Sequence, residues 1–202
     1  MAYDYQPFPY IAPPGLTAPE PRHPVLIVGA GPIGLAMAIE LANHGIKSVV
    51  LDDNNVVSVG SRAICWSKRS LEILDRLGVG ERSVTKGVTW KVGRTFHRDK
   101  EVFNFDLLPE DGHKMPAFVN LQQYFVEEYL VERAVELGVD LRWKIRVTDV
   151  DQKPDHATVR IETPDGPYQL EADWVIACDG ARSPIRDMLG LDFEGELFEE
   201  RF

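Results

Sequence analysis

The 202-residue sequence is poor in positive charge and in long apolar runs. It has 22 Lys and Arg against 32 Asp and Glu, and the formal net charge of −10 argues against nucleic acid or an anionic membrane as the main partner. No apolar stretch reaches the length of a membrane-spanning helix, and the first residues lack the basic-then-apolar pattern of a signal peptide. We therefore expect neither a nucleic-acid nor a membrane partner.

The residues of metal and disulfide chemistry are also scarce. The five histidines form no HxH or HExxH pattern, and the only two cysteines, Cys65 and Cys178, lack the spacing of metal ligands, so we expect no metal site. Two thiols without a signal peptide fit a reducing cytoplasm, where both are packed residues rather than a disulfide. The sequence thus indicates a cytoplasmic protein.

Proline and aromatic residues are concentrated at the N-terminus. Residues 1–24 hold seven of the fourteen prolines, together with Tyr3, Tyr5, Phe8 and Tyr10. This composition is incompatible with a regular helix or a central strand, so residues 1–23 are predicted to form an extended arm. The aromatic side chains predict that the arm lies on a surface, either of this chain or of a partner.

From Val25 onward, apolar strands alternate with helices, and 44% apolar residues suffice for a buried core. Periodicity and turn residues predict helices at 32–44, 67–77 and 121–138, and strands at 25–28, 46–51, 87–106, 139–150, 156–162 and 168–178. The opening strand–helix–strand unit, to which later strands return, indicates a doubly wound α/β domain. We expect the four tryptophans, Trp66, Trp90, Trp143 and Trp174, to be core residues.

The segment VGAGPIG joins the first predicted strand to the first helix. It comprises Gly29, Ala30, Gly31, Pro32, Ile33 and Gly34 in the G-x-G-x-x-G spacing of dinucleotide-binding domains. In this context the first glycine permits a tight turn, the second lets a pyrophosphate approach, and the third lets the helix pack on the strand. Amides at the helix N-terminus meet the phosphate charge.

Two acids, Asp52 and Asp53, follow the second predicted strand. Asp52 comes eighteen residues after Gly34, where an acid accepts hydrogen bonds from a ribose. Its charge would repel a 2′-phosphate, which disfavours NADP at this position. The glycine triplet and the acid do not separate NAD from FAD.

Three later segments resemble the flavoprotein aromatic hydroxylases, the single-component FAD-dependent monooxygenase family that includes phenol hydroxylase and 3-(3-hydroxyphenyl)propionate hydroxylase. GSRAICWSKRS resembles the family stretch beside the flavin and its pyrophosphate, and CDGARSPIRDMLG is similar to the family's Asp-Gly motif, which serves FAD and nicotinamide binding. NLQQYFVEEYL looks like the helix whose early Gln or Arg touches the flavin. The resemblance implies that the cofactor-binding residues include Ser61, Arg62, Ala63, Gln122, Asp179, Gly180 and Arg182.

The residues alone leave other readings open. Arg62 is also compatible with a solvated loop cation, and Asp179 with an ordinary turn before Gly180. Gln123 is an equal rival to Gln122 when the resemblance is set aside.

The resemblance implies an α/β, Rossmann-like FAD-binding domain at residues 24–190, with strands from 87–118 on the substrate side. It also implies the family's activity, in which NAD(P)H reduces FAD and O₂ then yields a flavin C4a-hydroperoxide that hydroxylates a phenolic ring. No catalytic residue can be named. A halogenase or prenyl reductase of the same superfamily, or a catalytically silent binding module, are the alternatives.

The resemblance covers about residues 24–202 and only the front portion of a family member. None of the sixteen glycines precedes an aspartate, so the family's later Gly-Asp motif is absent from this sequence. Residues 191–202 resemble the start of the family's β-rich substrate domain. We therefore expect that the chain alone does not hydroxylate phenols, and that it exposes an apolar surface that favours self-association.

Overall fold

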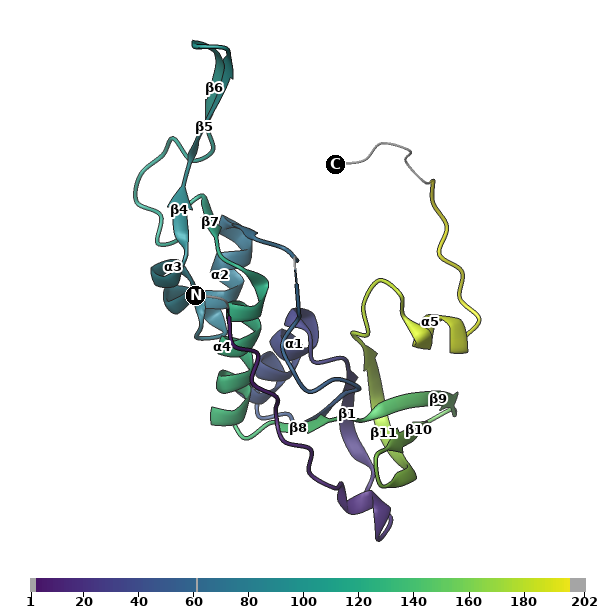
Figure 1. Cartoon of the computed structure of the whole chain (residues 1–202). Coiled ribbons are helices and arrows are strands. Elements are labelled where there is room, and N and C mark those ends of the chain that lie inside the picture. The colour runs from purple at the N-terminus through teal and green to yellow at the C-terminus, as the bar shows by residue number, and fades with distance from the viewer. Residues whose placement is uncertain (1–2, 61, 197–202) are drawn as a thin grey trace.

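The computed structural model describes residues 3–60 and 62–196. Its centre is a six-stranded sheet with the strand order β8-β2-β1-β11-β10-β9 (Figure 1). Four strands run parallel to one another: β1 (His23–Val28), β2 (Ser48–Asp52), β8 (Asp140–Trp143) and β11 (Gly166–Ala177). The antiparallel strands β9 (Arg146–Gln152) and β10 (Ala157–Thr163) complete one side. The predicted α/β class with a parallel sheet is confirmed.

Helices cover one face of this sheet. The first, α1 (Pro32–Asn43), begins with a proline in its first turn, and it packs beside α4 (Gln123–Glu136) (Figure 1). Val25 and Ile27 of β1 point toward this face and pack with Ala38 of α1. The intervening residue Leu26 packs on the opposite face, in a cluster formed with residues of β9, β10 and β11.

A smaller unit lies at the end of α4 that is distant from the six-stranded sheet. It contains α2 (Lys68–Arg76), α3 (Gly80–Lys86) and a three-stranded sheet of β3 (Cys65–Ser67), β7 (Phe118–Asn120) and β4 (Val88–Trp90). A two-stranded ribbon, β5 (Val92–His97) and β6 (Lys100–Asp106), projects away from the body (Figure 1). The strands predicted between 87 and 106 are present, whereas α3 was not predicted.

Residues 3–22 of the N-terminal arm are extended apart from the short 3₁₀ turn η1 (Pro14–Leu16), and they lie on the surface of their own chain. The Phe8 ring stacks on Trp143 with 4.5 Å between centroids. Both carboxylate oxygens of Glu20 accept hydrogen bonds at 2.8 Å from the buried Arg142 guanidinium. Burial alone would raise the pKa of Glu20, but these hydrogen bonds outweigh it and hold the pKa below its usual range.

Two predictions about the sheet were wrong. Residues 139–150 do not form one strand, because Lys144 adopts a positive φ of 61° and the chain divides there into β8 and β9, at opposite edges of the sheet. Trp174 is 71% exposed rather than buried. Strand β10 pairs with β11 only as far as Ala172, so Trp174 lies on a stretch that pairs with β1 alone in the described part of the chain.

The last described helix is α5 (Pro184–Met188), which is separated from the strand β11 by the segment 178–183. Across residues 3–60 and 62–196, no helix is long and apolar enough to cross a membrane.

Candidate functional site

The glycine segment forms the turn between β1 and α1, and each glycine has a different environment. Gly29 has a φ of +105°, and a Cβ there would lie 2.3 Å from the carbonyl oxygen of Cys178. A Cβ on Gly34 would lie 1.9 Å from the carbonyl oxygen of Gly29. Both positions therefore require glycine for the turn itself and for the contact between helix and strand.

Gly31 differs from these two glycines. It is the N-cap of α1, its φ of −74° suits any residue, and a Cβ built on it meets nothing within 4 Å. The turn itself therefore does not need a glycine at this position. An open backbone at a helix N-terminus is the geometry that lets a phosphate approach main-chain amides. Ile33 in the first turn is 71% exposed and leaves this end of the helix uncovered.

Asp52 lies at the C-terminal end of β2 and is tied to the glycine turn. Its Oδ2 accepts a hydrogen bond from the Ala30 N–H at 2.6 Å, and its Oδ1 accepts one from the Asn54 N–H at 2.8 Å. Burial raises the pKa of Asp52, and the two N–H donors reduce that rise without cancelling it. A carboxylate has about four acceptor positions, so capacity remains for ribose hydroxyls. The neighbouring Asp53 is exposed.

The Asp-Gly turn follows β11 on the other side of β1. The parallel pairing continues one residue beyond the strand, since the Cys178 N–H donates to the Val28 carbonyl at 2.7 Å. The Asp179 carboxylate accepts hydrogen bonds from Ser183 Oγ at 2.7 Å and from the Ile185 N–H at 3.0 Å, so it holds the first turn of α5. Gly180 has a φ of +88°.

These elements enclose a cleft of about 330 Å³ at the carboxyl ends of the parallel strands. Gly29, Asp52, Asp53 and Asp179 line it, together with residues of β9 and α5. Ligands of open α/β sheets bind outside the carboxyl ends of the strands, which is where this cleft lies. The structure thus brings Gly29, the acid after β2 and Asp179 together at one cleft, whereas Gly31, Gly34 and Gly180 do not line it.

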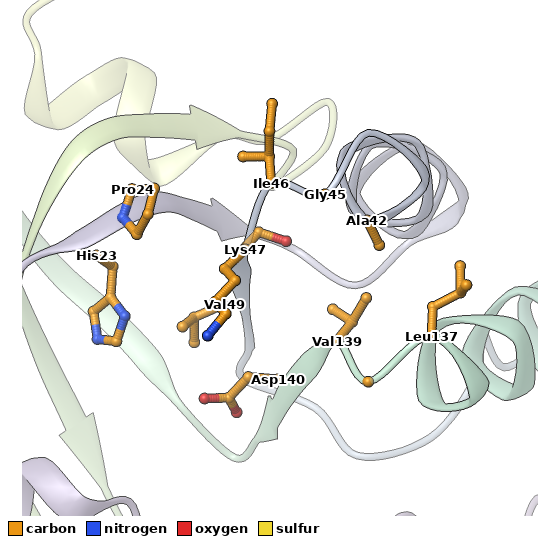
Figure 2. A pocket seen from close by; sticks show the side chains of 12 residues that line it. His23, Pro24, Ala42, Gly45, Ile46, Lys47, Val49, Leu137, Val139 and Asp140 are labelled. Atoms are coloured by element: carbon orange, nitrogen blue, oxygen red, sulfur yellow. The ribbon is translucent and has the colours of Figure 1, made fainter.

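A larger cavity, of about 490 Å³, lies at the opposite end of the strands. Figure 2 shows it between the starts of β1, β2 and β8 and the ends of α1 and α4, with Ile46, Lys47 and Val139 among its lining residues. None of the predicted site residues lines it. Size alone would therefore place the candidate site at the end of the sheet opposite to the predicted residues.

The remaining predicted residues lie farther along the chain. Ser61 falls outside the described residues. Arg62 and Ala63 are exposed in the segment between β2 and β3, and Arg182 is exposed in the turn before α5. Gln122 is the N-cap residue of α4, is exposed, and makes no side-chain capping hydrogen bond.

A polar cluster that was not predicted joins α4 to the segment after Asp52. Glu127 is only 2% exposed, and its carboxylate accepts hydrogen bonds from the N–H of Ser58 at 2.5 Å and from Ser58 Oγ at 2.6 Å. Gln123 Nε2 donates to the same carboxylate at 2.7 Å. The signal was present in the sequence, because Glu127 shares the apolar face of α4 with Leu130 and Ala134.

Known proteins resemble this chain in sequence over most of its length. The FAD binding domain family matches residues 22–200. Para-nitrophenol 4-monooxygenase of Pseudomonas sp. (strain WBC-3) is 34% identical over 181 residues, which cover 88% of this chain and 45% of that protein. The 12-dehydrotetracycline 5-monooxygenase/anhydrotetracycline 6-monooxygenase of Streptomyces rimosus subsp. rimosus is 35% identical over 177 residues, which cover 87% and 34%.

The solved structures give the same result. The crystal structure of p-nitrophenol 4-monooxygenase from Pseudomonas putida DLL-E4 matches with a TM-score of 0.80 and 32% identity, over 87% of this chain and 45% of that one. The chain therefore spans less than half the length of the relatives it matches.

Proposed function

The chain belongs to the FAD binding domain family, and from this we propose that it is the cofactor-holding part of an FAD-dependent monooxygenase that hydroxylates an aromatic, phenol-type substrate. Its relatives are monooxygenases named for p-nitrophenol and for tetracycline intermediates, which supports an aromatic substrate together with O₂. NAD(P)H is the expected reductant in this family.

The observation that carries the proposal is the contrast among the three glycines. Gly29 and Gly34 are needed by the protein fold, whereas the space beside Gly31 is open and lies at the N-terminus of α1. A glycine that the fold does not require points to a ligand that approaches the backbone closely. The residues present therefore fit the pyrophosphate of FAD.

Each residue of the site has a proposed part in holding the cofactor. Gly31 and the α1 N-terminus bind the pyrophosphate, while Asp52 accepts hydrogen bonds from the adenosine ribose and its charge rejects a 2′-phosphate. Arg62 offers positive charge toward the cofactor, and Asp179 forms the far wall of the cleft. When bound, FAD supplies the redox chemistry, and the protein's contribution is to bind it, orient it and exclude water.

The other assignments from the family stay proposals for this chain. Ser61, Ala63, Gln122, Gly180 and Arg182 are assigned to the FAD and nicotinamide surface by resemblance alone.

We also propose a reducing, cytoplasmic location. The support is that Cys65 and Cys178, the only two cysteines of the sequence, are both free thiols.

The test is direct binding of FAD to the purified chain, with the quenching of flavin fluorescence as the measure of binding. We expect one FAD per chain and competition by ADP, which carries the ribose and phosphates that contact Asp52 and Gly31. A chain that leaves flavin fluorescence unchanged at saturating protein would refute the proposal. Because the chain spans under half of its relatives, we expect no phenol-stimulated NAD(P)H oxidation from residues 1–202 alone.

A further inference from the structure

Nearly all of the N-terminal arm lies outside the family match, which begins at residue 22, yet the arm is firmly attached to the domain. Its attachment begins at the end nearest β1, where Glu20 pairs with the buried Arg142. Farther toward the N-terminus, Tyr10 Oη donates a hydrogen bond at 2.9 Å to Asp165, in the turn between β10 and β11. These contacts fix the direction in which the rest of the arm crosses the surface.

The next part of the arm pairs with the segment that follows Asp52, which we call the linking loop (residues 53–60). The Phe8 N–H donates to the Asn55 carbonyl at 2.6 Å, and Asn55 Nδ2 donates back to the Phe8 carbonyl at 2.9 Å. The Gly60 N–H lies 3.4 Å from Tyr5 Oη, near the other end of the loop. The stack of Phe8 on Trp143, the last residue of β8, holds the same part of the arm against the main sheet.

The opposite side of the linking loop is held by α4. Ser58 donates two hydrogen bonds to the buried Glu127, and Gln123 joins the same cluster. The tip of the arm reaches α4 as well, since the Tyr3 ring lies 4.2 Å from the Tyr124 ring. The linking loop is thus held between a helix of the family fold and an arm that the family match does not include.

The linking loop connects two parts of the cofactor site. It begins directly after Asp52, whose Oδ1 accepts a hydrogen bond from the Asn54 N–H, and it precedes Arg62 in the sequence. A loop that is already ordered loses less conformational freedom when a ligand binds, so its affinity for the ligand is higher. Contacts that order this loop therefore act on the cofactor without touching it.

We propose that the arm positions the cofactor site, with Phe8 and Asn55 as its positioning residues, by holding the linking loop in the geometry that receives FAD. This inference rests on the proposed function. This positioning role gives a reason for the buried ion pair and the ring stack that attach the arm to the domain.

The experiment compares FAD dissociation constants of the wild-type chain and three variants, at a temperature where circular dichroism shows each to be folded. Phe8→Ala removes the ring stack and should weaken FAD binding about tenfold, a change typical of one lost ordering contact. Phe8→Tyr keeps the ring and should restore wild-type affinity. Ile11→Ala is the matched control, because Ile11 belongs to the same arm but is 74% exposed.

A purely structural arm gives a different result. Phe8→Ala would then lower the melting temperature while leaving the FAD dissociation constant unchanged, and that outcome overturns the inference alone. If Phe8→Ala does not fold, Asn55→Ala takes its place, since it removes one hydrogen bond between arm and loop and keeps the stack; unchanged FAD affinity in this folded variant is equally decisive. Failure of the wild-type chain to bind FAD overturns the proposed function, and this inference with it.

Discussion

Replacing Gly31 with alanine should separate cofactor binding from folding. The added Cβ meets no protein atom within 4 Å, and the φ of −74° suits alanine. Alanine is a poorer N-cap than glycine but restricts the unfolded chain, and these two effects oppose each other at about 0.5–1 kcal/mol each. The free energy of unfolding should therefore change little.

The effect on FAD should be much larger. The new methyl group occupies the space through which the pyrophosphate approaches the amides, and a hydrogen bond to a charged group is worth about 1.5–3 kcal/mol. Losing one such bond should raise the dissociation constant for FAD roughly 10- to 150-fold. Titration of FAD against the variant and the wild-type chain measures this change.

Gly34→Ala is the matched comparison, because it places the same methyl group where the fold has no room. Its Cβ would lie 1.9 Å from the carbonyl oxygen of Gly29, a backbone atom that cannot move without shifting α1 from β1. We expect a loss of about 1–3 kcal/mol or more in unfolding free energy. The reasoning is refuted if Gly31→Ala binds FAD as tightly as the wild type, or if it destabilises the chain as much as Gly34→Ala.

Three further outcomes are expected. Asp52→Ala should weaken FAD binding by about 1–3 kcal/mol, because the ribose hydroxyls and the Ala30 N–H lose their acceptor; an unchanged affinity in calorimetry would exclude Asp52 as a cofactor residue. Burial and the carboxylate of Glu128 raise the pKa of Tyr3 to about 12, so its contribution to stability is complete below pH 10, the ordinary tyrosine value, and is lost as the pH rises from 10 toward 12. Urea unfolding at these pH values should show a decline that is smaller in Tyr3→Phe than in the wild type, and an equal decline in both proteins would contradict this. Trp174→Gln should reduce self-association, because the Trp174 side chain is a large apolar group that the sheet exposes to solvent. Light scattering measures this, and equal scattering by both proteins would contradict it.

The parts of the site that the sequence predicts are those governed by local backbone chemistry. The turn between β1 and α1 is specified by residues within a few positions of one another, and Asp52 is placed by the strand that it ends. The position of the cleft follows from the parallel sheet, because the carboxyl ends of such strands meet at one edge. These predictions needed no knowledge of distant contacts.

The features that were missed depend on tertiary contacts. Lys144 adopts a left-handed conformation, but no glycine or proline beside it indicates a turn. The sequence therefore predicted β8 and β9 as one strand. Glu127 and Ser58 are 69 positions apart, and only the packing of α4 against the linking loop brings them together. The arm was predicted to lie on a surface, but only the stack of Phe8 on Trp143 shows which one.

The strand order also bears on how the protein folds. Val25 of β1 pairs with Ser48 on one side and with Trp174 on the other, so the second pairing joins positions about 150 residues apart and carries a large loop-closure entropy. At a synthesis rate of about 5–20 residues per second, β1 waits roughly 7–30 s on the ribosome for β11. During that interval the apolar strand that leads into the glycine turn has an open edge, the kind of exposed surface that makes folding intermediates prone to association. The centre of the cofactor site is therefore completed late, and topology rather than local propensity should limit its folding rate.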